Sequence, residues 1–137
     1  MSDSKILAIL QNVKTIALVG ASDNPERPSN EVMAFLQGQG YRVIPVSPKL
    51  AGKTLLGEKV YAELKDIESP VDMVDVFRNA DAAYGVAQEA IAIGAKVLWM
   101  QIGVVNHDAE KLAQDAGLTV VMDVCPKKEI KRLGLIK

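Results

Sequence analysis

Five short apolar runs, each bounded by turn-forming residues, constrain the fold of this chain more than any other sequence feature. The runs are rich in β-branched residues and apolar on both faces, and they cover residues 15–20, 41–46, 71–77, 97–102 and 119–124. Strands that are apolar on both faces are typical of a parallel sheet covered on two sides. The pattern therefore predicts a buried parallel sheet of five strands.

Helices are predicted between these strands. The clearest is residues 80–93, in which apolar positions follow the i, i+3, i+4 spacing of an amphipathic helix. Shorter apolar stripes predict further helices over residues 3–12, 29–39 and 109–116, the last with Asp108 as its cap.

The alternation of strands and helices predicts an α/β fold: a Rossmann-like, doubly wound parallel five-stranded sheet flanked by helices in three layers. The link over residues 47–69 is irregular, and we expect a loop there with a short helix over residues 61–67. Because no linker, repeat or low-complexity tract divides the chain, we expect residues 1–137 to form a single domain.

Composition excludes several classes of partner. With 16 basic and 17 acidic residues the net charge is −1, so no whole-molecule field attracts nucleic acid or an acidic membrane surface. The chain has one cysteine, Cys125, and one histidine, His107, which leaves no zinc-ligand cluster. No apolar run is long enough for a signal peptide or a membrane span. We expect a cytoplasmic protein without a metal, and any anion site must be local.

The end of the first predicted strand suits a phosphate. In an open doubly wound sheet, ligands bind beyond the carboxyl ends of the strands. Here Gly20, Ala21 and Ser22 are small enough for the backbone to approach a phosphate, and the loop that follows carries Arg27 and Pro28 before a helix. A single glycine does not make the GxGxxG motif of dinucleotide sites. On this segment alone, a plain turn with a solvated arginine is an equal alternative.

The end of the second predicted strand is more informative. NAD-binding folds place an acidic residue there to bind the ribose hydroxyls, whereas this chain has Ser47, Pro48 and Lys49. A hydroxyl and an ammonium suit an additional phosphate on the ribose, as in NADP or coenzyme A (CoA). The alternative for Lys49 is a solvated loop lysine.

The remaining strand ends carry four more candidates. Phe77 can line an adenine or pantetheine groove and Arg78 can meet a pyrophosphate, although a core phenylalanine and a surface arginine are as common. Gln101 is a polar interruption at the sheet rim that can bind a ligand or cap a turn. A lone cysteine such as Cys125 is more often a buried, inert thiol.

No catalytic residues are predicted. His107 has no recognisable nucleophile or base beside it in the sequence, and an exposed or capping role is the stronger interpretation. Ser22 lies outside the GxSxG pattern of hydrolases. The strand ends thus favour phosphate binding without an acid–base pair or an activated nucleophile.

Five segments in order resemble the small stand-alone bacterial CoA-binding proteins of the YccU type. They are residues 16–22 (IALVGAS), 43–49 (VIPVSPK), 71–78 (VDMVDVFR), 90–101 (AIAIGAKVLWMQ) and 121–126 (VMDVCP). That family is similar to the N-terminal CoA-binding domain of the succinyl-CoA synthetase alpha subunit, which has a Rossmann-like fold. The resemblance covers nearly the whole chain. It sets CoA beside NADP as the two ligands between which an experiment must decide.

The resemblance implies a division of labour among the candidate residues. By motif, Gly20, Ala21, Ser22 and Arg27 face the CoA phosphates; Ser47, Pro48 and Lys49 hold the ribose phosphate; Phe77 and Arg78 line the opposite groove; and Gln101 and Cys125 lie on the pantetheine side. The phosphorylated histidine of the synthetase belongs to a second domain, and 137 residues leave no room for it. We therefore expect this chain not to make acyl-CoA by itself.

Three functional hypotheses remain. The first is a module that binds CoA or an acyl-CoA without catalysis, as a regulator or as the partner of another enzyme. The second is a small NADP-dependent oxidoreductase, supported by Ser47 and Lys49. The third is the CoA-binding subunit of an acyl-CoA ligase, which requires a partner chain. The sequence shows no interface that decides for or against a homo-oligomer.

Overall fold

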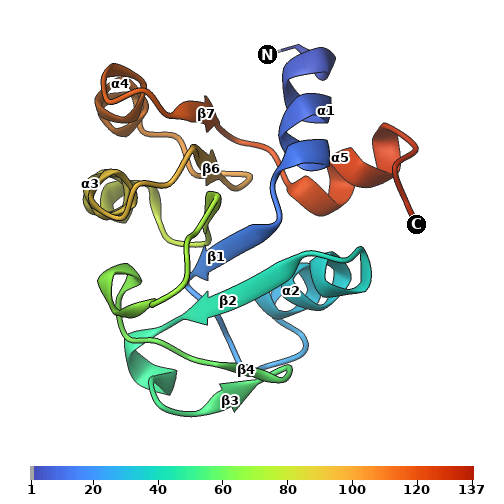
Figure 1. Ribbon diagram of the computed structural model, residues 1–137, viewed down its shortest axis with the longest axis vertical. Helices are drawn as coiled ribbons and strands as arrows, with labels where there is room; N and C mark the ends of the chain where they lie inside the picture. Colours follow the sequence, from blue (N-terminus) through green and yellow to red (C-terminus); the bar gives the residue numbers. More distant parts are fainter. Residues whose placement is uncertain (1) are drawn as a thin grey trace.

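A parallel five-stranded sheet forms the centre of the computed structural model, which describes residues 2–137 (Figure 1). The strand order is β2-β1-β5-β6-β7. The strands are β1 (Thr15–Val19), β2 (Arg42–Val46), β5 (Met73–Val76), β6 (Val97–Met100) and β7 (Thr119–Val121). The first strand, β1, lies in the interior of the sheet; β2 pairs on one side of it, and the chain then crosses to add β5, β6 and β7 on the other side. The predicted Rossmann-like sheet is confirmed, with its strand order reversing between β1 and β5.

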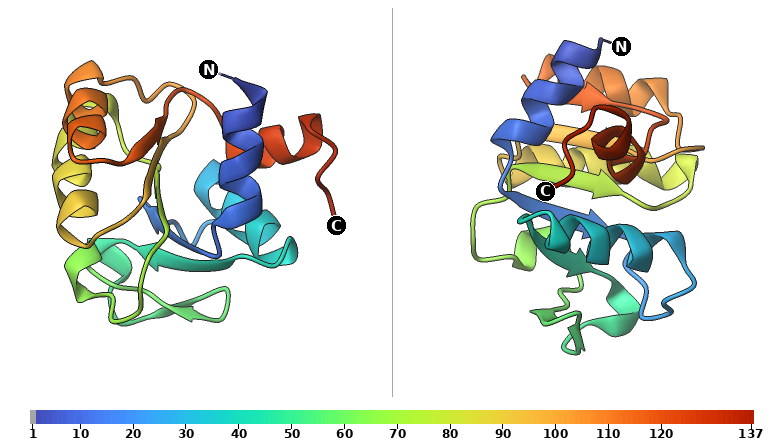
Figure 2. Two further views of the ribbon diagram at one scale, coloured as in Figure 1. Left: turned by 45° about the horizontal axis from the view of Figure 1, so that its top comes forward. Right: turned by 90° about the vertical axis from the view of Figure 1, so that its right-hand side faces the viewer.

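Helices cover both faces of the sheet, as predicted (Figures 1 and 2). One face packs against α1 (Asp3–Asn12), α2 (Pro28–Gly38) and α5 (Pro126–Arg132). The other face packs against α3 (Ala83–Ala92) and α4 (His107–Asp115). The three layers follow from strands that are apolar on both sides, because each face must be buried by its own helices.

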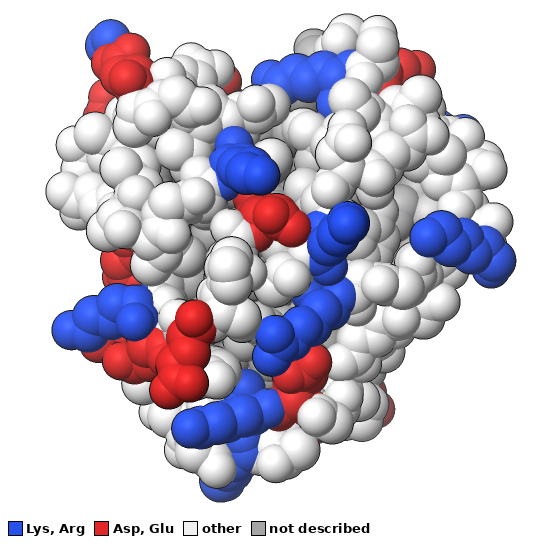
Figure 3. Space-filling view, viewed as in Figure 1, with Lys and Arg blue, Asp and Glu red and all other residues white. Residues whose placement is uncertain are grey.

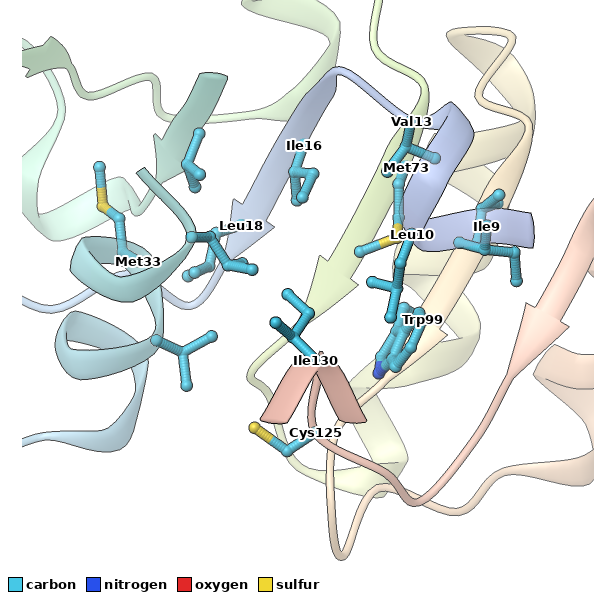
Figure 4. Close-up of a cluster of buried hydrophobic side chains, with 14 of the residues drawn as sticks. Ile9, Leu10, Val13, Ile16, Leu18, Met33, Met73, Trp99, Cys125 and Ile130 are labelled. Carbon is cyan, nitrogen blue, oxygen red and sulfur yellow. The ribbon is translucent and has the colours of Figure 1, made fainter. Parts of the chain in front are cut away.

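The two apolar clusters differ in the size of their side chains. Figure 4 shows the cluster on the α1, α2 and α5 side, where Trp99, Met33 and Ile16 are fully buried. The α3 and α4 side contains many alanines, among them Ala87 and Ala113. Small side chains allow these two helices to lie close to the sheet and to each other.

The first and last helices lie side by side (Figure 2). Ile9 and Leu10 of α1 belong to the same buried cluster as Ile130 of α5. At the surface, the guanidinium of Arg132 lies 2.8 Å from a carboxylate oxygen of Asp3. The two ends of the chain are thus joined by an apolar contact with an ion pair beside it.

Several predicted boundaries were wrong by a few residues. The first and last strands end at Val19 and Val121, because the chain leaves the extended conformation at Gly20 (φ 94°) and Asp123 (φ 64°). Strands β5 and β6 likewise end earlier than predicted, at Val76 and Met100.

The cap predicted for α4 was also wrong. Asn106, rather than Asp108, caps this helix, since the Asn106 side chain accepts a hydrogen bond of 2.9 Å from the Ala109 amide. The cap places the start of α4 earlier than the apolar stripe suggested. Before α3 the chain forms a separate 3₁₀ turn, Ala80–Ala82, which Asn79 caps by accepting a hydrogen bond of 2.9 Å from the Ala82 amide.

The irregular link contains more structure than predicted. It holds a 3₁₀ turn at Pro48–Leu50, a hairpin of β3 (Thr54–Leu55) and β4 (Glu58–Lys59), and a second 3₁₀ turn at Leu64–Asp66. The predicted helix over residues 61–67 is reduced to this last turn. Two-residue strands carry too few alternating positions to be recognised in a sequence.

In residues 2–137 no helix has the length and apolar character needed to cross a membrane. The same residues bring together no group of three or more histidine, cysteine, aspartate or glutamate side chains that could hold a metal ion. On the face shown in Figure 3, basic and acidic side chains are interspersed, in keeping with the net charge of −1.

Candidate functional site

The carboxyl ends of β1 and β5 lie side by side where the strand order reverses. Gly20 has no side chain, so the backbone after β1 can lie close to the backbone after β5. The Gly20 amide donates to the Val46 carbonyl at 3.0 Å, and the Phe77 amide donates to the Val19 carbonyl at 2.8 Å. A Cβ atom at residue 20 would lie 2.2 Å from the Phe77 carbonyl oxygen. Glycine is therefore required at this position by its positive φ and by its neighbour.

One cavity opens beside this point and unites residues from three predicted strand ends. It has a volume of about 510 Å³. The predicted residues that line it are Gly20, Ala21, Ser47, Pro48, Lys49 and Arg78. We call it the Ser47 cavity. Glu63 and Glu89 also line it, and sequence reasoning did not find them, because neither lies at the end of a strand.

Two backbone amides in the lining of the Ser47 cavity are already engaged within the protein. The amides of Gly20 and Ala21 both donate to the Val46 carbonyl, at 3.0 and 3.2 Å. Ser47 is buried, and its hydroxyl makes no cap bond to the turn that follows. Lys49 is exposed. The Ser47 hydroxyl and the Lys49 ammonium can bind an anion in this cavity, whereas the carboxylates of Glu63 and Glu89 in the same lining repel one.

A second groove, of about 630 Å³, lies on the α2 and α5 side of the same strand ends. The predicted residues that line it are Pro28, Phe77, Arg78, Gln101 and Cys125. We call it the Cys125 groove. Ile102 and Val104, from the loop after β6, extend its apolar lining.

The two hollows share Arg78. This side chain is exposed, and within residues 2–137 no acidic side chain forms an ion pair with it. A guanidinium between two openings can hold a phosphate of a ligand that extends from one into the other.

Three lysines at the rim of the Cys125 groove were missed by the sequence analysis: Lys127, Lys128 and Lys131. They belong to α5, a seven-residue helix too short to show periodicity. The ammonium groups of Lys127 and Lys131 lie 5.6 and 5.7 Å from the ring centre of Phe35. Pro126 at the start of α5 was the one available signal of a helix here.

Gln101 and Cys125 are buried residues that bring polar atoms to the lining of this groove. Gln101 is only 6% exposed, and its side-chain oxygen Oε1 has no hydrogen-bond partner. Its backbone carbonyl closes a turn by accepting from the Val104 amide at 2.9 Å. Cys125 is 7% exposed. The Gln101 backbone therefore ends the strand, and its buried side-chain oxygen is left without a hydrogen-bond donor.

Two predicted residues line neither hollow. The Ser22 hydroxyl accepts a bond of 3.1 Å from the Asn24 amide, and the Ser22 carbonyl accepts one of 2.9 Å from the Asn30 side chain. Arg27 is exposed immediately before α2, outside both sets of lining residues. In this structure Ser22 orders the loop, and Arg27 is a surface residue.

Comparison with known proteins gives this geometry a context. Residues 14–131 match the family described as "CoA binding domain". The chain belongs to this family. It is 43% identical over 126 residues to the uncharacterized protein YneT of Bacillus subtilis, with 92% of each protein covered.

Solved structures of the same fold extend the comparison. A hypothetical protein from Pyrococcus horikoshii is 41% identical and matches with a TM-score of 0.93 over 97% of this chain and 92% of its own. A dinucleotide-forming acetyl-coenzyme A synthetase from Ca. Korarchaeum cryptofilum is 25% identical, with a TM-score of 0.68. That match covers 83% of this chain and 27% of the synthetase. This member of the CoA-binding domain family thus resembles one part of a larger enzyme.

Proposed function

We propose that this protein binds CoA or an acyl-CoA across the two hollows, and that binding, rather than a reaction, is its own activity. The phosphorylated nucleotide occupies the Ser47 cavity and the pantetheine arm occupies the Cys125 groove. The observation that carries this proposal is that Arg78, which forms no ion pair within residues 2–137, lines both hollows. One hollow holds a hydroxyl, an ammonium and two carboxylates, and the other is a mainly apolar groove. Membership of the CoA-binding domain family supports the choice of ligand.

The chemistry of CoA matches this division. Its adenosine carries a 3′-phosphate and a pyrophosphate, which require cations and hydroxyl donors. Its pantetheine arm has an apolar carbon chain interrupted by amide groups, which suits an apolar groove with a few polar atoms. Lys49 and Arg78 then supply local positive charge that the net charge of −1 does not.

A calorimetric titration tests the ligand and the place of its 3′-phosphate together. We expect binding of CoA that weakens with dephospho-CoA, and no comparable binding of NAD. Lys49→Ala should weaken the binding of CoA about tenfold, because one charge-assisted contact is lost. The affinity for dephospho-CoA should stay nearly unchanged. Lys53→Ala, an exposed lysine of the same link outside both hollows, is the matched control.

Two outcomes would contradict this proposal. Equal losses for CoA and dephospho-CoA in Lys49→Ala would remove Lys49 from the 3′-phosphate site. Binding of NADP without CoA would replace the proposal with an oxidoreductase, the interpretation that Ser47 and Lys49 also allow.

Replacing Gln101 tests the position of the pantetheine arm. The orphan Gln101 Oε1 is a buried acceptor, and a pantetheine amide N–H is a donor that would satisfy it. Gln101→Leu should weaken CoA by about five- to tenfold and leave the affinity for adenosine 3′,5′-bisphosphate, which lacks the arm, unchanged. Calorimetry on both ligands measures this. A similar loss for both would place the arm elsewhere.

A further inference from the structure

The Cys125 groove holds the one thiol of this chain, in a place where the proposed ligand brings another. Cys125 lines the groove together with Phe77 and Gln101. Figure 4 shows its side chain at the margin of the buried cluster that contains Trp99 and Ile130. Because Cys125 as a residue is 7% exposed and lines this groove, its thiol can be reached chiefly by a molecule seated in the groove.

An independent observation indicates that this groove takes a ligand. Gln101 is more than nine-tenths buried and lines the groove, and its Oε1 atom has no partner. A buried acceptor without a donor costs about 1–3 kcal/mol, and because Gln101 also lines the groove, a donor seated there would remove this cost. An amide N–H of a pantetheine arm would satisfy it beside Cys125.

We propose that Cys125 exchanges with CoA disulfide and carries CoA as a mixed disulfide. This inference rests on the proposed function, because the groove must first seat the pantetheine arm. The Cys125 thiol loses its proton, and its sulfur attacks one sulfur of the CoA disulfide. The sulfur–sulfur bond of the CoA disulfide breaks as the Cys125–CoA bond forms, and the departing CoA thiolate takes up a proton. One disulfide is exchanged for another, so no further oxidant is required.

The surroundings of Cys125 make the exchange selective for a phosphorylated disulfide. Lys127, Lys128, Lys131 and Arg78 place four cations around the groove against one carboxylate, that of Glu31, which lies 3.9 Å from the Lys127 ammonium. They attract the phosphates of CoA disulfide, whereas burial of Cys125 hinders attack on disulfides that do not bind in the groove. Selectivity is therefore the property that separates this site from an ordinary exposed thiol.

Intact-protein mass spectrometry tests the exchange. The reduced protein, freed of reductant, is incubated separately with CoA disulfide and glutathione disulfide. We expect one CoA adduct per chain, mapped to Cys125 and reversed by dithiothreitol, forming at least tenfold faster than the glutathione adduct. Absence of the CoA adduct, or equal rates for the two disulfides, would overturn the inference.

A relocated thiol is the matched control. Ser4 is exposed on α1 and lines neither hollow, so Ser4→Cys in a Cys125→Ser background presents the same group away from the groove. This variant should react with both disulfides without preference. If it shows the same preference for CoA disulfide, the selectivity does not come from the groove and the inference is wrong.

Calorimetry with reduced CoA separates failure of this inference from failure of the proposed function. If the native protein binds CoA but forms no adduct, the exchange is wrong and the binding function stands. If it does not bind CoA, both are wrong, and any adduct is then unselective thiol chemistry.

Discussion

Replacing Gly20 by alanine is expected to lower the free energy of unfolding by about 2–5 kcal/mol, a large part of the total of a domain this size. Two costs contribute. The first is the left-handed φ of 94°, which costs a residue with a side chain roughly 1–2 kcal/mol. The second is the contact of the new Cβ with the Phe77 carbonyl oxygen, 2.2 Å away before any relaxation. Relief of that contact requires β1 and β5 to separate at the mouth of both hollows.

Equilibrium unfolding in urea measures this change, and Gly94→Ala is its control. Gly94 also has a positive φ, 76°, but a Cβ there would meet no atom within 4 Å. The Gly94→Ala variant should lose only roughly 1–2 kcal/mol of unfolding free energy, the cost of the left-handed backbone conformation. Equal losses in the two variants would show that the Phe77 backbone yields without cost, and that Gly20 is required only for its φ.

Replacing Asp75 by asparagine is expected to stabilise the protein, by an amount that increases with pH. Asp75 is fully buried in the central strand β5, in register with Leu18 of β1 and Trp99 of β6. Neither of its carboxylate oxygens has a hydrogen-bond partner. Burial disfavours the charged form and raises the pKa of Asp75 well above its usual value.

The sign of the pH dependence follows from this raised pKa. The native state keeps the Asp75 proton over a range in which the unfolded chain, with a pKa of about 3.9, has lost it. Its contribution to stability is fully present below that unfolded pKa and is lost as the pH rises through the native pKa. Asparagine removes this loss, so the gain over the native protein should grow as the pH rises from about 5 to about 9.

Urea unfolding at several values between about pH 5 and pH 9 measures the difference. Asp72→Asn is the contrasting variant. Burial by itself raises the pKa of Asp72. Hydrogen bonds from the Lys14 and Thr15 amides and the charges of Lys96 and Lys14 lower the pKa by more, so the net shift is downward. Its contribution is present above the unfolded pKa and lost as the pH falls through the native one, and its replacement should destabilise the protein at neutral pH. Parallel curves for native protein and Asp75→Asn would refute the prediction for Asp75.

The sheet and its flanking helices could be predicted because burial on two sides leaves clear patterns in the sequence. The pattern of residues 80–93 indicated α3, and the doubly apolar runs indicated the five strands. The residues at which helices and strands begin and end were harder to predict, because each boundary depends on single contacts. Nothing in the spacing of residues 106–116 distinguishes the Asn106 cap from an Asp108 cap, since both side chains can accept the same type of bond.

The candidate site was predictable to the extent that it is built from strand ends. Parallel strands bring their carboxyl ends to one edge, so Ser47, Arg78 and Cys125 could be expected near one another from the strand pattern alone. The direction in which a loop turns is not fixed by topology, which is why Arg27 lies away from both hollows. Lys127 escaped prediction for a different reason, since α5 is defined by its packing on the sheet and α2 rather than by periodicity.

The contact between α1 and α5 has a consequence for how the protein is made. A ribosome synthesises α1 before α5, yet these two helices share one apolar cluster, and α5 supplies three of the lysines that line the Cys125 groove. Until residues 126–132 emerge, part of one sheet face has no cover, and the groove lacks a wall. The nascent chain can therefore complete the Cys125 groove only after α5 has docked beside α1.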